Sequence, residues 1–133
     1  MAKIRRNPNA LRALDKRLTR NAEVAGMYVV GKIQLKLSRT QPVSRSDTGR
    51  LRGLDPSKPG TAPKTVTGQL RQSIFHRVMR TEKGEGRRLR IGSSAGYARF
   101  LEPGTDRGIR NRPFLLSTIQ SNRRGILKRL RKK

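Results

Sequence analysis

The chain has 133 residues, of which 32% are apolar and 4% aromatic, so it is predicted to form one domain with a small, mostly aliphatic core that gains stability from a partner. Its 33 lysines and arginines against 8 aspartates and glutamates give a net charge of +25, which indicates a nucleic acid or an acidic protein as partner. The absence of cysteine excludes disulfides and thiolate metal sites, and no apolar run approaches the roughly 18 residues of a membrane-spanning helix.

A long amphipathic helix is predicted over residues 8–38. Asn7 can act as its N-cap, and Pro8 occupies the first helical position, where a missing N–H costs nothing. Apolar residues then recur at steps of three and four: Leu11, Leu14, Leu18, Ala22, Ala25, Val29, Ile33 and Leu37. Gly26 and Gly31 weaken the helix and leave room for another backbone to approach. Such a helix is roughly 45 Å long, longer than a domain of this size, so part of it is expected to project or to lie against a neighbour.

Residues 39–66 are predicted to form a long loop, because Ser, Thr, Pro and Gly dominate there and aliphatic residues are sparse. A loop longer than about 15 residues in a compact domain is usually functional or mobile, and a disordered linker is the alternative. After this loop, Thr67 can cap a short helical turn that runs to Ser73, and Gly68 permits the tight entry into that turn.

A small antiparallel sheet is predicted within residues 67–115. Apolar residues on both faces of the segment 74–81 predict one strand, and Leu89 and Ile91 alternate with arginines in a second. The polar residues 82–86 between them are typical of a turn. These elements predict a hairpin.

The stretch from Tyr97 to Leu115, YARFLEPGTDRGIRNRPFL, which we call the pinned loop, contains three aromatics, two prolines and two glycines. Its backbone is therefore strongly restricted. Apolar side chains are expected to anchor its two ends in the core: Tyr97, Phe100 and Leu101 at one end, Phe114 and Leu115 at the other. Glu102 is expected to pair with Arg112, since a bidentate bond would join those ends; a solvated pair is the alternative.

Residues 113–131 are predicted to form a basic C-terminal helix, with apolar residues at near-helical spacing: Leu116, Ile119, Ile126, Leu127 and Leu130. Cations at a helix C-terminus complement its dipole, but there are too many here for that role alone. We therefore expect the cations of this region to contact DNA or an acidic partner: Arg123, Arg124, Lys128, Arg129, Arg131, Lys132 and Lys133. Together the elements predict one α+β domain over residues 1–133, in which the long N-terminal helix and the C-terminal helix pack on a small antiparallel β-sheet.

Two sequence blocks are specific enough to resemble a known family. The first is YARFLEPGT (residues 97–105) followed by RPFL (residues 112–115), and the second is PGTAP (residues 59–63) with TGQLRQSI (residues 67–74). Both are similar to blocks of the gene-product-ten-like neck proteins of long-tailed phages, which act in tail completion and head–tail connection. Together they span about the C-terminal two thirds of the chain in the order of the family, and the helix lies before them, as the family leads one to expect.

The resemblance implies a structural virion protein that is not an enzyme and needs no cofactor. Its subunits would form a ring, six-fold as in related necks, that joins the DNA-filled head to the tail. Head-closure or adaptor proteins and the tail terminator or tail tube would be its neighbours, residues 39–66 would help subunits clasp one another, and genomic DNA would be contacted through phosphates. The start of the chain lacks the apolar stretch of a signal peptide, so we expect synthesis in the host cytoplasm and a final place in the virion neck.

The residues expected at subunit or partner interfaces lie in these two blocks. They are Thr67, Gly68, Leu70, Arg71, Tyr97, Glu102, Gly104, Thr105, Arg112, Pro113 and Phe114. No catalytic or metal-binding residues are expected, because the carboxylates are scattered. The lone histidine, His76, has no sequence neighbour that would orient it, and we expect it at the surface or at a sheet edge.

Composition alone would favour another class, a small basic nucleic-acid-binding protein of ribosomal type. The scarcity of aromatic residues for base stacking weighs against it, and it leaves the two blocks without a purpose. A third class, an enzyme acting on nucleic acid, lacks the carboxylate cluster that a metal-dependent nuclease needs.

Overall fold

The computed structural model describes residues 7–39, 60–63, 68–82, 84, 86–106 and 111–132. They form an α+β arrangement, as predicted, with a long N-terminal helix, a two-stranded antiparallel sheet and a helical C-terminal segment. In chain order the elements are α1 (Pro8–Arg39), α2 (Gln69–Gln72), β1 (Ile74–Arg80), β2 (Arg87–Ser93), α3 (Ala98–Leu101), α4 (Leu116–Ser121) and α5 (Arg123–Leu130).

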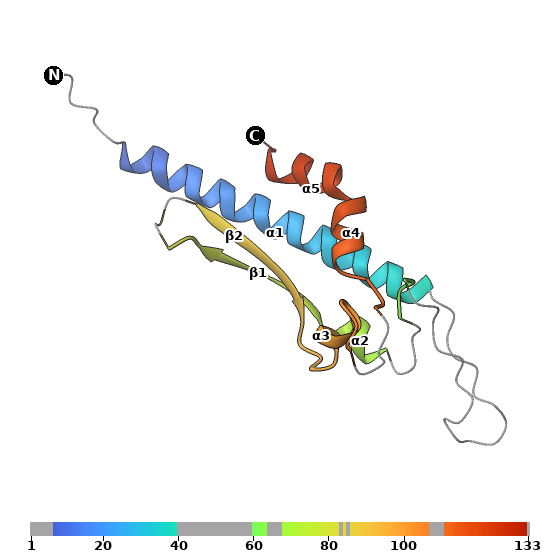
Figure 1. Ribbon diagram of the computed structural model, residues 1–133. Helices are drawn as coiled ribbons and strands as arrows, with labels where there is room; N and C mark the ends of the chain where they lie inside the picture. The colour runs from blue at the N-terminus through green and yellow to red at the C-terminus, as the bar shows by residue number, and fades with distance from the viewer. Residues whose placement is uncertain are drawn as a thin grey trace, which may run out of the picture.

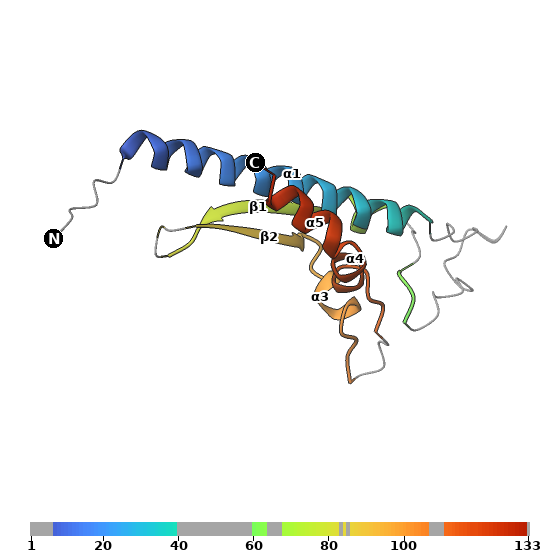
Figure 2. The same cartoon turned by 90° about the horizontal axis from the view of Figure 1, so that it is seen from above.

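Helix α1 is the element against which the others pack. The hairpin of β1 and β2 lies along one face of it, and α5 runs beside another face in the opposite direction (Figures 1 and 2). Asn7 caps α1 as predicted, because its Oδ1 accepts hydrogen bonds from the amides of Asn9 (3.0 Å) and Ala10 (3.3 Å). The apolar stripe is buried from Ala22 onward but not at its start, where Leu11 is 51% exposed. The expected projection of part of α1 is therefore confirmed.

The hairpin has the predicted strands in a simple register that runs from the pair Ile74 and Ser93 to the pair Arg80 and Arg87. Its turn is closed by the amide of Thr81, which donates to the carbonyl of Gly86 (3.1 Å). Before β1, helix α2 starts after Gly68, whose φ of 76° confirms the tight entry that glycine permits. Thr67, the predicted cap, and residues 40–59 and 64–66 of the predicted loop lie outside the described residues.

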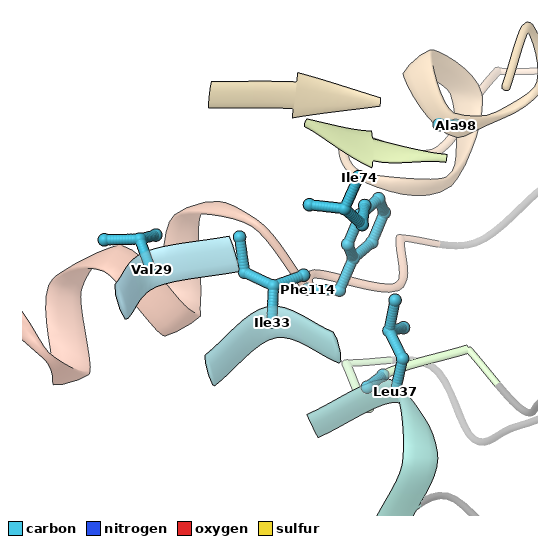
Figure 3. Close-up of a cluster of buried hydrophobic side chains, with 7 residues drawn as sticks. Val29, Ile33, Leu37, Ile74, Ala98 and Phe114 are labelled. Atoms are coloured by element: carbon cyan, nitrogen blue, oxygen red, sulfur yellow. The ribbon is translucent and has the colours of Figure 1, made fainter. Parts of the chain in front are cut away.

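The core is formed where α1, the start of β1 and the pinned loop meet (Figure 3). Phe114 is fully buried there against α1, whose Val29 and Ile33 are also fully buried. Smaller contributions come from Leu37, Ala62, Ile74 and Ala98. The prediction that Phe114 anchors the end of the pinned loop is confirmed.

The other end of the pinned loop differs from the prediction. Tyr97 is 42% exposed and Phe100 is 40% exposed, while Ala98 is buried and Leu101 packs against the core. The physical reason is that α3 makes a helical turn, which brings residues three apart to one face. Ala98 and Leu101 take the inner face, so the two aromatic side chains are turned outward.

The predicted C-terminal helix is two helices, because the chain bends at Asn122 (φ −105°, ψ 12°) between α4 and α5. The Asn122 side chain donates back to the carbonyl of Thr118 (2.9 Å) and accepts from the Tyr28 hydroxyl of α1 (3.2 Å). Gly125 then lies against the same tyrosine, so close that a Cβ there would be 3.0 Å from Tyr28 Cζ. The bend turns α5 onto α1, and Tyr28 holds it there.

The far end of α5 is also attached to α1. The side-chain amide of Asn21 donates to the carbonyls of Leu130 (3.2 Å) and Lys132 (2.6 Å). These are carbonyls that the end of a helix leaves without intrahelical partners. Side chains of α1 therefore hold α5 at both ends.

Candidate interaction surfaces

The fold brings together the two sequence blocks that resemble the neck family. The amide of Gly60 donates to the carbonyl of Asn111 in the pinned loop (2.9 Å). Ala62, two residues later, is buried in the same cluster as Phe114. The blocks therefore meet at one end of the molecule, although they are far apart in sequence.

Glu102 joins the two ends of the pinned loop, but not through the side chain of Arg112 as predicted. Its carboxylate accepts hydrogen bonds from three successive amides at the start of α4, those of Phe114 (2.9 Å), Leu115 (3.0 Å) and Leu116 (2.7 Å). Arg112 instead donates its backbone N–H to the carbonyl of Leu101 (2.7 Å). The first amides of a helix have no intrahelical acceptor and carry partial positive charge, so a carboxylate satisfies them well.

The other residues predicted at an interface fall into buried and exposed groups. Phe114 and Leu70 belong to the core region, and Gly104 has a φ of 79° that favours glycine. Thr105 and Pro113 are half-buried. Only two of the described set are open to solvent, Arg71 and Tyr97.

Arg71 is attached to the end of α1. Its Nη1 donates to Ser38 Oγ (3.1 Å), and its carbonyl accepts from Gln34 Nε2 (3.3 Å). It therefore links α2 to α1.

Several large apolar side chains that were not predicted at a surface are exposed. On α1 they are Leu11, Leu14, Val24, Met27 and Leu35, and near the pinned loop they are Phe100 and Leu116. Leu116 and Met27 are each 58% exposed. The exposure of Leu11 and Leu14 could be expected from the sequence, because the apolar stripe of α1 is longer than the rest of a small domain can cover.

The predicted C-terminal cations are mostly exposed, as contact with a polyanion requires. Arg123, Arg124, Lys128, Arg131 and Lys132 are open to solvent, and Lys133 lies outside the described residues. Arg129 differs, because its guanidinium stacks on the ring of Tyr28, 3.6 Å from the centroid, and its Nη1 donates to the carbonyl of Gly125 (2.9 Å). Arg129 holds α5 to α1.

On the hairpin side of α1, charged groups are paired. The Asp15 carboxylate accepts hydrogen bonds from the guanidinium groups of Arg87 and Arg80, the latter at 3.3 Å. Arg87, whose side chain is only 10% exposed, also donates to Thr19 Oγ1 (2.7 Å). Two arginines of the hairpin are thus bound to the first half of α1.

His76 lies on β1, an edge strand of the two-stranded sheet as expected, but its side chain faces α1 and is half-buried, so it is not a surface residue. Its Nε2 lies 2.8 Å from the Glu23 carboxylate, and its side chain is 21% exposed. Gly26 makes this approach possible, because a Cβ there would be 2.7 Å from His76 Cγ. The room predicted at this glycine is filled by an imidazole and not by a backbone.

Among the described residues, no three His, Asp or Glu side chains gather where they could hold a metal ion. None of the described helices is both long enough and apolar enough to cross a membrane. Comparison with family models, with curated proteins and with solved structures found no match to the chain.

Proposed function

We propose that the protein is a structural subunit of a phage neck, where copies of it form a six-fold ring between the DNA-filled head and the tail. The observation that carries the proposal is the meeting of the two family-like blocks. The hydrogen bond from Gly60 to Asn111 and the shared burial of Ala62 and Phe114 make one structural unit of them.

The exposed apolar side chains support assembly into a larger structure. Leu11 and Leu14 on the projecting start of α1, and Tyr97 and Phe100 in the pinned loop, are each at least 40% exposed. Such residues lower the free energy of association when a neighbour covers them. The two groups lie at different ends of the molecule, which suits a subunit that contacts a neighbour on each side in a ring.

The positive charge suits a ring whose channel carries DNA. The exposed cations of α5 would contact phosphates without reading sequence. Neighbouring neck proteins with acidic surfaces would be attracted by the same charges.

The test is complementation of a phage in which the gene for this protein is disrupted. Filled heads and separate tails should accumulate, and the purified protein should join them, as counted by electron microscopy. The double variant Tyr97→Ala, Phe100→Ala should fold and fail to join them. Its control, Arg77→Ala with Arg90→Ala, removes two exposed side chains of the hairpin and should join them as the parent does. Particles that are joined without this protein would overturn the proposal.

The exposed cations of α5 also favour a second candidate, a nucleic-acid-binding protein of ribosomal type. It predicts that the protein sediments with ribosomal subunits and that its loss leaves head–tail joining intact. The same disruption experiment therefore separates the two functions.

A further inference from the structure

A groove of about 340 Å³ lies between the second half of α1 and α4. Its α1 wall carries three cations, Lys32, Lys36 and Arg39. They are four and three residues apart, so they share one face of the helix. Like charges at this spacing repel one another, although Lys36 and Arg39 lie in the last turn of α1 and also complement the helix dipole.

The opposite wall of the groove is polar and neutral. It includes Thr118, Ser121 and Asn122, whose side chains donate to carbonyls of their own helical segment at 2.6, 2.8 and 2.9 Å. Because three of the four O–H and N–H donors of these side chains are already engaged, recognition of an anion depends mainly on the cations of α1. The small side chains of α4 leave the cations accessible.

Lys36 is held in position at this wall. Its Nζ donates to Ser117 Oγ at 2.6 Å, which leaves two of its three N–H donors for a ligand. Lys32 is also oriented, with its Nζ 5.5 Å from the centroid of the Tyr28 ring. Two of the three ammonium or guanidinium groups are thus placed before any ligand arrives.

The charge of the groove is not neutralised from within. In the described part of the chain, no carboxylate is among the residues that line it. The acids of α1, Asp15 and Glu23, are bound to side chains of the hairpin. A concave site lined by charges of one sign concentrates counter-ions.

We propose that this groove binds a phosphate group of a nucleic-acid backbone, with sequence-independent contacts from Lys32, Lys36 and Arg39. Arg123 and Arg124 directly follow Asn122 of the groove and are exposed, so further cations are available next to it for other phosphates of the same backbone. No aromatic side chain lines the groove among the described residues, so bases are not read there. The inference deepens the proposed function, because it names the residues that would face DNA in the channel.

The decisive experiment places a negative charge in the groove and another beside it. Ser121→Glu adds a carboxylate to the groove, and Gln120→Glu adds one to the neighbouring exposed position of α4 that does not line it. Binding to a short double-stranded DNA of mixed sequence is measured by fluorescence anisotropy over a series of KCl concentrations. Ser121→Glu should lower the slope of log K against log salt by about 1 unit or more, and Gln120→Glu should keep the slope of the parent. Equal slopes for the two variants would overturn the inference.

A second pair of variants covers the case in which Ser121→Glu disturbs α4, which circular dichroism would reveal. Lys32→Gln with Arg39→Gln removes two cations from the groove and keeps the bond of Lys36. Arg77→Gln with Arg90→Gln removes two exposed cations from the hairpin. The groove pair should flatten the salt slope by about 2 units and the hairpin pair by clearly less; equal flattening would mean that only the net charge matters and would overturn the inference.

Two further measurements distinguish DNA binding by the groove from binding of an acidic protein, and from the neck proposal. A poly-glutamate peptide is used as a competitor of DNA. If the peptide displaces DNA from the parent at the same charge concentration, and the groove variants bind both ligands equally weakly, the groove is a site for acidic protein and the inference is wrong.

Head–tail joining is measured in parallel. Groove variants that lose DNA affinity and still join heads to tails support the inference. If the parent protein itself joins nothing, the neck proposal fails while the DNA measurements still decide the groove.

Discussion

The two faces of α1 use charge in opposite ways. On the hairpin face, Asp15 binds Arg80 and the largely buried Arg87, and Glu23 binds His76, so carboxylates of α1 hold side chains of the hairpin. On the face toward α4, the cations lie along a groove that no described carboxylate lines. Asp15 and Glu23 thus serve the fold, as Glu102 also does at the start of α4.

This difference shows how a protein of such high net charge can have a defined fold. Burying an unpaired charge is costly, whereas an exposed one costs little. Acids are therefore most useful beside the few cations that packing buries, and the remaining cations can be left in solvent for a partner. The net charge of +25 is in this view a property of surfaces and not of the core.

The largest loss of stability is expected from a change in the core that the hairpin and the pinned loop form with α1. Phe114→Ala removes a fully buried ring that packs on α1 and should lower the free energy of unfolding by about 3–5 kcal/mol, a large share of the stability of a single domain. Urea denaturation followed by circular dichroism measures it. Phe100→Ala, the same change at a side chain that is 40% exposed, is the control and should unfold near the parent. A Phe114→Ala variant with the urea midpoint of the parent would contradict the placement of Phe114 in the core.

A larger residue at position 26 should disturb only the packing of the hairpin on α1. In Gly26→Val the new Cβ would meet His76 Cγ at 2.7 Å and Leu89 Cδ1 at 3.0 Å, so overpacking should cost about 2–3 kcal/mol. Gly31→Val is matched to it on the same helix, and nothing lies within 4 Å of the added atom. NMR signals of the imidazole of His76, the one histidine of the chain, should move in the first variant and stay in the second. Unchanged signals in Gly26→Val would contradict the described approach of His76 to Gly26.

Removing an acid from the hairpin face should cost less. Asp15→Asn leaves the side chain of Arg87, only 10% exposed, without its carboxylate, but Asp15 itself is 39% exposed, so we expect a loss of about 1–2 kcal/mol. Asp106→Asn, at an exposed position of the pinned loop, should change the urea midpoint little. Restoring stability in Asp15→Asn by adding Arg87→Met would show that the loss comes from the unpaired guanidinium. Equal midpoints for the two single variants would contradict the division between the faces.

The smallest effect on stability is expected from the exposed cations of α5. Replacing Lys128, Arg131 and Lys132 with Gln should change the free energy of unfolding by less than about 0.5 kcal/mol, because Asn21 contacts only the backbone carbonyl of Lys132. Arg129→Gln is the contrast, since it removes the stacking on Tyr28 and should cost about 1 kcal/mol. Thermal denaturation of both proteins measures the difference. A triple variant less stable than Arg129→Gln would show that these cations serve the fold.

The parts of the fold that were predictable from sequence are those that neighbouring residues determine. The cap by Asn7, the stripe of α1 and the alternation of the hairpin are local patterns, and all three were right. The bend at Asn122 was not predictable, because it depends on Tyr28, 94 residues away. The same holds for Glu102, since a carboxylate cannot be assigned to backbone amides before the path of the loop is known.

The candidate surfaces were predictable in part for the same reason. The excess of cations at the C-terminal end could be read directly, but the role of Arg129 in packing could not. Lys32, Lys36 and Arg39 were overlooked because a cation at every third or fourth position of a helix is typical of a solvated face. Only the position of α4 makes a groove of them.

The attachment of α5 to α1 has a consequence for the order in which the protein can fold. The side-chain amide of Asn21 bonds to a carbonyl 109 residues later in the chain. The hairpin that covers the other face of α1 is also synthesised after α1. Until residue 130 has been made, the leucines, valines and isoleucines of α1 have no complete cover. Contacts between such distant residues form slowly, because a long loop must close first. Helix α1 is therefore made before the elements that bury it, and its exposed apolar side chains favour aggregation of the nascent chain in the meantime.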